Sequence, residues 1–369
     1  MEKKKILYIV STLKKGGPVN IIKNIIRYLD RDFFDVIILT LSKEPKNSDK
    51  DFFENNLKVK VYSLNTSRVK GIFCLKKMIN DFIKKNNIDL VHSHGLRPDI
   101  FSSFSPVSKI TTLHNNPFLD YAYSFGKIKG YLIAKIHLHF IKKFDYKISC
   151  SKYTSEILRK KTDIDFKFIQ NGINLEDYDY SSKDRLKKEL NLSNDDIVFI
   201  SVGVLNNRKD PLTIINAFNM IKNERFKLLI LGDGKLFENC KKRAINKNIL
   251  FSGMVNNVFE YLKISNYFIS ASLAEGLPNS VLEAMGVGLP CLLSNIPSHC
   301  EVLDSDKLTK YIFKIKDSGD LLNKINQITL DDYKELSQIS KSIVKSNFTV
   351  KIMSQKYQAL YKKSAWNLS

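Results

Sequence analysis

Long apolar runs, paired cysteines and acidic side chains are all scarce in this chain of 369 residues. No run approaches the ~18 uninterrupted apolar residues that a membrane-spanning helix needs, so we expect no such helix. The N-terminus lacks the small-residue cleavage site of a signal peptide, which predicts a cytoplasmic protein. The five cysteines are odd in number and include no CxxC pair, so we expect reduced, mostly buried thiols and no zinc site.

Acidic residues are outnumbered, because 59 lysines and arginines face 38 aspartates and glutamates, a formal net charge of +21. Such an excess indicates an anionic partner, such as nucleic acid, an acidic membrane face or a phosphorylated ligand. The lysines are scattered, however, and a general lysine-rich composition explains the excess equally well. The length and the hydrophobic fraction of 43% predict a folded protein of two domains.

Short apolar, β-branched runs alternate with segments of helical period along the whole chain. Examples are KILYIVS and DVIILTLS in the first half, and DIVFISVG and KLLILGDG in the second. Runs this apolar indicate parallel sheets covered by helices on both faces. Two such series predict an α/β protein with two Rossmann-like, doubly wound domains, residues 1–180 and 190–345. A polar stretch at 174–190 is predicted to join them, and a helical tail at about 348–366 is expected to pack back on the first domain.

Glycines and histidines of the first half follow predicted strands, where ligands of doubly wound sheets bind. Gly16 and Gly17 precede an amphipathic helix that begins near Pro18, which suits either a phosphate cradle or a tight turn. His94 and His114 each end a strand, so their imidazoles can face a cleft. There they could hydrogen-bond to a sugar or phosphate, or move a proton near neutral pH.

Three neighbouring side chains have simpler explanations. His92 lies inside a predicted strand and is expected to be packed in the core. Arg97 and Asp99 follow closely and could contact a ligand, although a surface salt bridge is the more common explanation for such a pair.

The loop after DIVFISVG carries two adjacent cations, Arg208 and Lys209. The helix behind them is predicted to have Asp210 as its N-cap and Pro211 as its first residue. Two cations beside a helix N-terminus fit a diphosphate clamp, and a solvated loop is the alternative. The turn in LILGDGKL lacks the third glycine of a dinucleotide fingerprint, so we do not expect an NAD site there.

The stretch AEGLPNSVLEAMGVGLP places Glu275 and Glu283 around the start of a helix expected near Ser280. Ser280 and Glu283 fit a capping box, in which the carboxylate accepts a hydrogen bond from the N-cap N–H. That pattern leaves Glu275 and the Gly-Leu-Pro turn unexplained. A helix N-terminus with free N–H groups suits a diphosphate, and carboxylates accept hydrogen bonds from vicinal hydroxyls. Both features together match a sugar nucleotide.

This stretch resembles the E-x7-E signature of the retaining family-4 glycosyltransferases, whose GT-B fold has two facing Rossmann-like domains with a cleft between them. Weaker resemblances follow in the family's order, among them TLHNN, IQNGINLEDY and SVGVLNNRKDP. The resemblance implies a hexosyltransferase, of the EC 2.4 class, that helps to build bacterial capsule, O-antigen, lipopolysaccharide or exopolysaccharide. It implies a nucleotide-sugar donor of a hexose or N-acetylhexosamine, for which UDP is expected, and a lipid-linked or saccharide acceptor.

The resemblance also assigns residue roles. Glu283 would bind ribose hydroxyls, while Glu275 and His114 would be catalytic residues that face the transferred hexose. The expected donor-binding residues are Gly17, Arg208, Lys209, Gly276, Leu277, Pro278, Asn279, Ser280 and Glu283. His94 and Arg97 are the acceptor-side candidates. Val204 stands where the family often has arginine, which makes the diphosphate clamp depend on Arg208 and Lys209.

The resemblance further implies retention of the anomeric configuration. We expect neither a metal nor another cofactor, because no DxD motif follows a strand and the cations can stabilise the leaving diphosphate.

The segment 123–147 combines lysines with apolar residues, a pattern typical of a helix that lies on an anionic leaflet. We expect peripheral association with the inner face of the cytoplasmic membrane through it, and a packed helix with a solvated lysine face is the alternative. Two further functions stay open. A sugar-nucleotide epimerase or a phosphorylase shares the fold, although E-x7-E argues against the epimerase. A nucleic-acid-binding protein rests on charge alone, so we expect no nucleic acid among the partners.

Overall fold

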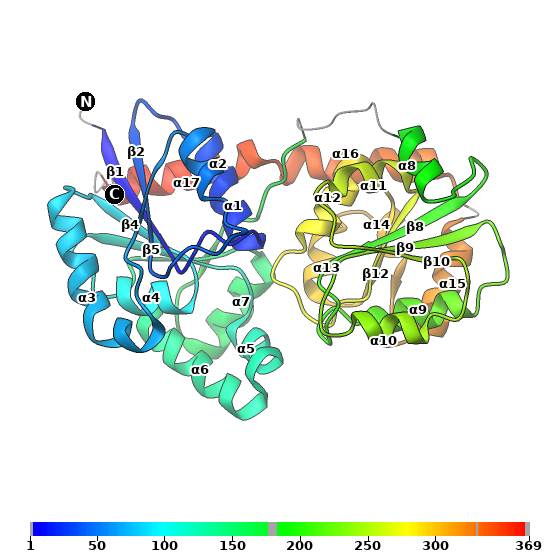
Figure 1. Cartoon of the computed structure of the whole chain (residues 1–369), viewed down its shortest axis with the longest axis horizontal. Coiled ribbons are helices and arrows are strands. Elements are labelled where there is room, and N and C mark those ends of the chain that lie inside the picture. Colours follow the sequence, from blue (N-terminus) through cyan, green and yellow to red (C-terminus); the bar gives the residue numbers. More distant parts are fainter. Residues whose placement is uncertain (1–2, 176–182, 330, 366–369) are drawn as a thin grey trace. The chain divides into compact units, whose positions relative to one another are not determined.

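The computed structural model describes residues 3–175, 183–329 and 331–365, and the chain divides into two units (Figure 1). The first unit is Met1–Gly172 together with Val350–Ser369, and the second is Ile173–Thr349. Each unit contains one parallel sheet with helices packed against it. Residues 176–182 of the predicted joint, and Trp366 of the predicted tail, lie outside the described residues.

The sheet of the first unit has seven strands in the order β3-β2-β1-β4-β5-β6-β7. The strands are β1 (Lys4–Val10), β2 (Phe34–Thr40), β3 (Lys60–Ser63), β4 (Leu90–Ser93), β5 (Ser108–Leu113), β6 (Tyr146–Ser149) and β7 (Lys167–Phe168). The helices are α1 (Gly17–Arg27), α2 (Lys50–Asn55), α3 (Arg68–Lys85), α4 (Leu96–Ser102), α5 (Pro117–Phe125), α6 (Lys127–Ile141), α7 (Lys152–Thr162) and α17 (Val350–Ala365). The parallel order and the chain reversal beside β1 are those of a doubly wound sheet.

Both faces of this sheet are buried, as the apolar strand sequences predict. Ile6 and Tyr8 of β1 pack with α1 and α17 on one face, while Leu7 of the same strand packs with α3 on the other. The hydroxyl of Tyr361, on α17, lies 2.6 Å from the Tyr8 hydroxyl and 2.8 Å from Nδ1 of His92. His92 is fully buried, which confirms the prediction of a core histidine. The last helix is thus an integral part of the first unit.

The sheet of the second unit has six strands in the order β10-β9-β8-β11-β12-β13. The strands are β8 (Ile197–Val202), β9 (Phe226–Leu231), β10 (Ile249–Gly253), β11 (Tyr267–Ser270), β12 (Cys291–Ser294) and β13 (Ile312–Phe313). The helices are α8 (Lys183–Glu189), α9 (Pro211–Asn219), α10 (Phe237–Arg243), α11 (Val258–Ile264), α12 (Asn279–Val287), α13 (Pro297–Val302), α14 (Asp306–Thr309), α15 (Ser318–Ile328) and α16 (Tyr333–Asn347). The order reverses at β8 and β11, so the loops that follow these two strands flank the switch point where ligands bind.

One glycine fixes how the loops beside this switch point approach each other. Gly232, at the end of β9, has φ of 131°, and a Cβ atom there would lie 1.9 Å from the carbonyl oxygen of Gly203. Only glycine combines that backbone conformation with so close an approach. The glycines of LILGDGKL therefore allow the loop after β9 to pack closely against the loop after β8.

The thiols and the helix lengths can be compared with two expectations from the sequence, namely reduced cysteines and the lack of a membrane-spanning helix. All five cysteines are free thiols, and Cys150, Cys240 and Cys291 are buried. Among the helices that the structure describes, none combines the length and the apolar character that crossing a bilayer requires.

Candidate active site

Glu275 lies in the loop after β11, where three donors bind its nearly buried carboxylate. Lys209 Nζ lies 2.5 Å from Oε1, Arg208 Nη1 lies 2.8 Å from Oε2, and Ser272 Oγ donates to Oε1 at 2.7 Å. Burial disfavours the charged form of Glu275, but Lys209 and Arg208 outweigh that cost and hold its pKa at about 2. The carboxylate is therefore ionised at every physiological pH.

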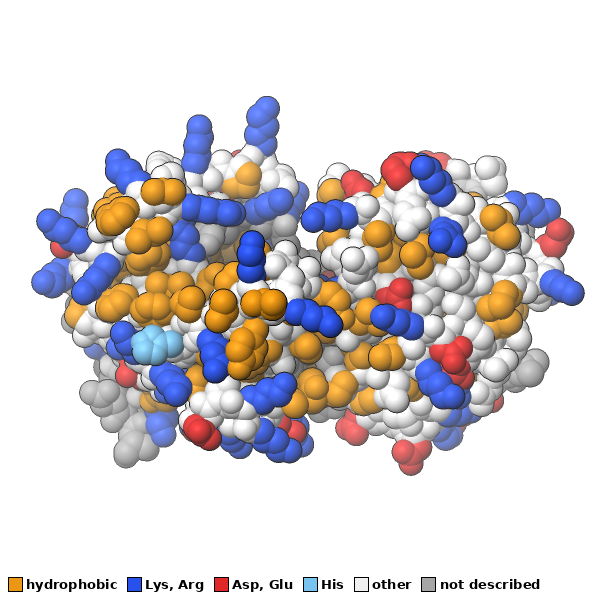
Figure 2. All heavy atoms as spheres, turned by 90° about the horizontal axis from the view of Figure 1, so that it is seen from below, with side chains coloured by type: hydrophobic (Ala, Val, Ile, Leu, Met, Phe, Trp, Pro, Cys, Tyr) orange, Lys and Arg blue, Asp and Glu red, His pale blue; other side chains and the backbone are white. Residues whose placement is uncertain are grey.

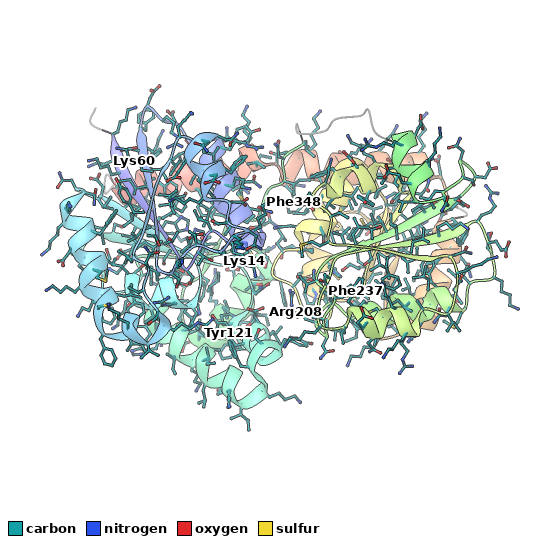
Figure 3. The ribbon with its side chains drawn as sticks, in the orientation of Figure 1. Lys14, Lys60, Tyr121, Arg208, Phe237 and Phe348 are labelled. Atoms are coloured by element: carbon teal, nitrogen blue, oxygen red, sulfur yellow. The ribbon has the colours of Figure 1, made fainter. Side chains whose placement is uncertain are left out.

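The same ion pairs clamp two loops together at the carboxyl edge of the second sheet. Arg208, labelled in Figure 3, also donates from Nη1 to the carbonyl of Ala274 at 2.8 Å. The N–H of Leu273 in turn donates to the Arg208 carbonyl at 2.8 Å. The two predicted clamp cations thus pair with Glu275 in this structure. Two cations against one carboxylate leave a net positive charge beside α12, which attracts an anion.

The start of α12 differs from the predicted capping box. The helix begins at Asn279, and its N-cap is Pro278, which makes no side-chain cap hydrogen bond. Proline has no N–H for a carboxylate to accept from, and Glu283 lies more than a turn inside the helix. The capping-box prediction for Ser280 and Glu283 is therefore wrong, and another explanation is needed for this glutamate.

Glu283 has a carboxylate that the described residues leave without a partner. Within residues 3–175, 183–329 and 331–365, no side chain or N–H donates a hydrogen bond to it and no cation pairs with it. Because nothing offsets its partial burial, the pKa of Glu283 is raised from 4.5 to about 7. A carboxylate that lacks hydrogen-bond donors among the described residues suits a ligand whose hydroxyl groups can donate to it.

The turn between the two glutamates carries the remaining donor-side candidates. Gly276, Leu277 and Pro278 are buried, and Asn279 and Ser280 are partly buried in the first turn of α12. The N–H and hydroxyl of Ser280 form no hydrogen bond with the described part of the chain. An N–H at this position is one of the groups that an anion at a helix N-terminus accepts from.

The loop after β8 also departs from one local prediction. Asp210 precedes α9 as expected, but its backbone is left-handed, with φ of 45° and ψ of 54°, and its side chain accepts from the Thr213 hydroxyl at 2.7 Å instead of capping an N–H. Val204 is 57% exposed and lines a small pocket with Lys209 and Ser272. An apolar side chain there donates nothing, so the positive charge in this pocket comes from Lys209.

A buried network of hydrogen-bonded side chains supports Glu275, and the sequence analysis did not predict it. Ser272, which donates to Glu275, lies 3.2 Å from the hydroxyl of Ser270. Nε2 of the buried His299 lies 3.5 Å from that second hydroxyl, and its Nδ1 lies 2.9 Å from the Ser294 carbonyl. Burial lowers the pKa of His299 to about 4, so its ring is neutral and positions the serines. These residues meet because β11 pairs with β12, which leads into α13, and no local motif reveals that arrangement.

The two histidine candidates of the first unit are neighbours. Nδ1 of His94 lies 2.9 Å from Nε2 of His114, and the rings are stacked with centroids 5.1 Å apart. Burial lowers the pKa of His114 to about 4, and burial together with the nearby His92 and His114 rings lowers the pKa of His94 well below its usual value. Both rings are therefore neutral near pH 7, which favours hydrogen bonding over the proton transfer considered from the sequence. Nε2 of His94 is buried without a partner in the described residues.

Arg97 and Asp99 do not form the expected surface salt bridge. The guanidinium of Arg97 donates to Ser42 at 2.6 Å and to Thr66 at 2.9 Å, so it ties together the loops after β2 and β3. Asp99 is fully buried and bonds to Nε2 of His137 at 2.8 Å. Asp99 is thus part of the scaffold, whereas the role of Arg97 toward an acceptor stays a prediction.

Gly17 occupies the predicted position as the first residue of α1, with Gly16 as the N-cap and Pro18 next to it. The preceding loop is held by Glu44, whose two carboxylate oxygens lie 3.0 and 3.2 Å from the N–H of Leu13. The N-terminus of α1 carries no acidic side chain in its first turn. An anion at this N-terminus would meet no like charge there, so the phosphate cradle and the tight turn both stay open as explanations of the glycine pair.

Two family models match this chain, and together they cover most of both units. Glycosyltransferase Family 4 matches residues 15–177, and Glycosyl transferases group 1 matches residues 182–345. The chain belongs to the glycosyltransferases.

Relatives and solved structures support this identification over the whole length. The glycosyltransferase is 28% identical to the O-antigen biosynthesis glycosyltransferase WclY of Escherichia coli, over 97% of this chain and 98% of the relative. It is 27% identical to an Escherichia coli UDP-Gal:alpha-D-GlcNAc-diphosphoundecaprenol alpha-1,3-galactosyltransferase, over 85% and 84%. The solved structure of Anabaena HepE in complex with UDP and glucose superposes with a TM-score of 0.80 at 16% identity, covering 98% and 100%. The likeness to such structures confirms the predicted GT-B fold.

Proposed function

We propose that this glycosyltransferase moves a hexose or N-acetylhexosamine from a UDP-sugar to a lipid-linked or saccharide acceptor in the synthesis of a bacterial surface polysaccharide, such as O-antigen or capsule, with retention of configuration. The observation that carries the proposal is the pair of glutamates in and just before α12, of which Glu283 has no partner among the described residues and Glu275 is held by two cations. The name of the galactosyltransferase relative supports a UDP-linked donor and a diphosphate-linked lipid acceptor.

The donor-binding step follows from the charges of the second unit. Ribose hydroxyls donate to Glu283, which satisfies a carboxylate that the protein leaves without donors. The diphosphate accepts from the N-terminus of α12 at Ser280 and from Lys209 and Arg208. These two cations are then shared between the diphosphate and Glu275, whose oxygens become available to the hydroxyls of the transferred sugar.

Departure of the nucleoside diphosphate develops negative charge on its terminal phosphate. Lys209, Arg208 and the first N–H groups of α12 stabilise that charge, so the proposal needs no divalent metal. His114, neutral and bonded to His94, contributes a hydrogen bond to the sugar or the acceptor. Retention is supported by the family resemblance and by the alpha linkage in the name of the relative.

The test is a thermal-shift screen with UDP-, GDP-, ADP- and dTDP-sugars, followed by transfer to a lipid-linked or soluble saccharide acceptor. We expect a UDP-sugar to raise the unfolding temperature, and we expect transfer to persist in EDTA. Proton NMR of the product would show the same anomeric configuration as the donor. Conversion of the donor without any acceptor would instead support the epimerase, and an inverted product would refute retention.

We also propose that the first unit associates with an anionic membrane leaflet. Figure 2 shows apolar side chains interspersed with lysines on one face of this unit. Large apolar residues are exposed on the neighbouring helices α5 and α6, namely Leu119, Tyr123, Phe125, Ile128, Tyr131, Leu132 and Ile136. The first turns of α3 add Val69, Ile72 and Phe73. Exposed apolar side chains framed by lysines complement the hydrocarbon boundary and the negative charge of such a leaflet.

The structure refines the segment that the sequence singled out. Gly126, with φ of 85°, ends α5 and begins α6, so residues 123–147 are not one helix. Leu132 and Ile136 are exposed, whereas Leu138 is buried in the core, so only part of the apolar pattern is available to a membrane. The sequence analysis did not include the exposed residues of α3 in the proposed membrane-binding surface, because α3 is far along the chain from residues 123–147.

A further inference from the structure

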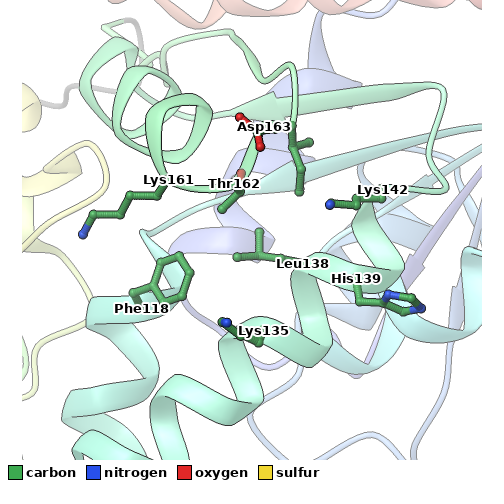
Figure 4. A pocket seen from close by; sticks show the side chains of 9 residues that line it. Phe118, Lys135, Leu138, His139, Lys142, Lys161, Thr162 and Asp163 are labelled. Atoms are coloured by element: carbon green, nitrogen blue, oxygen red, sulfur yellow. The ribbon is translucent and has the colours of Figure 1, made fainter.

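A pocket of about 300 Å³ lies between α6 and α7 in the first unit, apart from every histidine and arginine discussed as a site residue (Figure 4). Its floor consists of Leu138 and Ile164, two buried members of one apolar core cluster. Phe118, at the start of α5, lines one side. The volume lies at the low end of the roughly 300–1,000 Å³ typical of small-molecule sites.

Cations surround this apolar floor. Lys135 and Lys142 come from α6 and its C-cap, and Lys161 comes from the last turn of α7. Asp163 is the single carboxylate of the lining, so three lysines leave a net charge of +2 when the one lining histidine is neutral. In Figure 4, Leu138 lies between Lys142 on one side and Phe118 with Lys161 on the other.

The three lysines are available to a ligand. None of them pairs with a carboxylate in the described parts of the chain. Lys161 Nζ lies 5.8 Å from the centroid of the Phe118 ring, and Lys135 Nζ lies 5.2 Å from that of Tyr131. These cation–π contacts orient the ammonium groups without neutralising them.

The pocket is preformed, because buried contacts hold α5 and α6 in place. His137 of α6 bonds through Nε2 to Asp99 and through Nδ1 to the Tyr121 hydroxyl of α5, each at 2.8 Å. A Cβ on Gly130 would lie 2.5 Å from backbone atoms of Tyr121 and Ala122, so only glycine allows this approach of the two helices. The helices that carry the lining therefore need no rearrangement when a ligand binds, which lowers the conformational cost of binding.

We propose that this pocket binds the phosphate of a lipid. The phosphate lies among Lys135, Lys142 and Lys161, and the first carbons of the lipid lie against Leu138, Ile164 and Phe118. The exposed apolar residues of α5 and α6 continue from this rim, since the Phe118 and Tyr131 ring centroids are 5.6 Å apart. The inference rests on the proposed membrane association and specifies that the pocket recognises the phosphate group of a lipid.

The test compares two triple variants of the full chain in vesicle cosedimentation. The pocket variant is Lys135→Gln with Lys142→Gln and Lys161→Gln. The matched control is Lys351→Gln with Lys356→Gln and Lys363→Gln, which removes the same charge from exposed positions of α17, on the opposite sheet face. We expect the pocket variant to lose roughly 100-fold in vesicle affinity and the control less than about threefold. Thermal unfolding of both variants checks that they fold.

Three arms identify the source of the phosphate. Phosphatidylcholine vesicles carry either phosphatidylglycerol or polyprenyl phosphate at equal charge, and inorganic phosphate is titrated in the absence of vesicles. Tighter binding to polyprenyl phosphate would assign the pocket to the acceptor carrier, and equal binding would assign it to a bilayer headgroup. Equal losses in both triple variants would overturn the proposal, because the attraction would then be diffuse. Inorganic phosphate that binds as tightly as the vesicles would overturn the lipid part.

The same proteins separate this inference from the proposed function. Hydrolysis of a UDP-sugar without acceptor, or its transfer to a soluble saccharide, involves none of the substituted lysines in the proposed reaction and should be equal in all three proteins. If hydrolysis and transfer persist while the lysines prove irrelevant to vesicle binding, only the pocket proposal fails. If no donor reacts with any of the proteins, the transferase proposal fails and the vesicle result can still be interpreted.

Discussion

Replacing Glu283 by glutamine should make the protein more stable while it weakens donor binding. In the folded protein the pKa of Glu283 is raised from 4.5 to about 7, because burial disfavours a charge that no partner offsets. An acid with a raised folded pKa carries no penalty below about pH 4.5, loses stability as the pH rises toward 7, and carries the full penalty above that value. This difference in pKa corresponds to about 3 kcal/mol.

Thermal unfolding at two pH values measures this penalty. At about pH 8, Glu283→Gln should raise the unfolding temperature of the second unit by about 5–10 °C, and near pH 4.5 the gain should vanish. Glu238→Gln, at an exposed position of α10 in the same unit, is the matched control and should change the unfolding temperature by less than about 2 °C.

Donor affinity should move in the opposite direction. Ribose hydroxyls donate to a carboxylate more strongly than to an amide oxygen, so Glu283→Gln should weaken UDP-sugar binding by about 10- to 100-fold. In the unsubstituted protein the affinity should rise with pH up to about 7, as Glu283 ionises, and then level off. A variant that loses stability equally at both pH values, or that binds the donor with unchanged affinity, would refute the reasoning.

Three further predictions concern other residues. Glu275→Gln should cost about 3 kcal/mol of unfolding free energy above pH 4.5, because the pKa of about 2 reflects ion pairs that this change removes, and urea titrations should show the loss shrinking as the pH falls toward 2. Phe73→Ser with Ile128→Ser should reduce affinity for anionic vesicles by about tenfold without changing the unfolding temperature, since these side chains are 85% and 80% exposed. Tyr361→Phe should lower the stability of the first unit by about 1–3 kcal/mol in urea, because it leaves the buried Tyr8 hydroxyl with one partner fewer; an unchanged midpoint would contradict that network.

The fold class followed from the sequence because the strands of doubly wound sheets are buried on both faces. Runs such as KILYIVS mark a central strand whatever else surrounds it. The shortest strand of the second unit was not predicted, since β13 spans only Ile312–Phe313 and carries too few residues to show a period. The helix in the tail was recognisable from its apolar spacing, but its hydrogen bonds to Tyr8 and His92 were not.

The candidate site, too, was predictable only in part. The sequence alone predicted that Glu275, Glu283 and the two cations lie beside the starts of helices. Their interactions required the structure, because Arg208 and Glu275 are brought together by the strand order, which places β8 beside β11. The capping-box prediction failed because its pattern begins at Ser280, two residues after the proline that takes the N-cap position. The exposed apolar side chains of α3 could not be distinguished from core residues by spacing alone.

The position of α17 has a consequence for biosynthesis. Tyr357 and Tyr361 are buried against β1 and β4, so the first sheet awaits a helix that is synthesised only after the whole second unit. The second unit has all of its described strands before residue 349 and can complete its sheet first. A nascent chain from which only the residues up to Thr349 have emerged should therefore contain a complete second unit and a first unit whose sheet is partly uncovered where α17 will pack, which is the form that a chaperone would recognise.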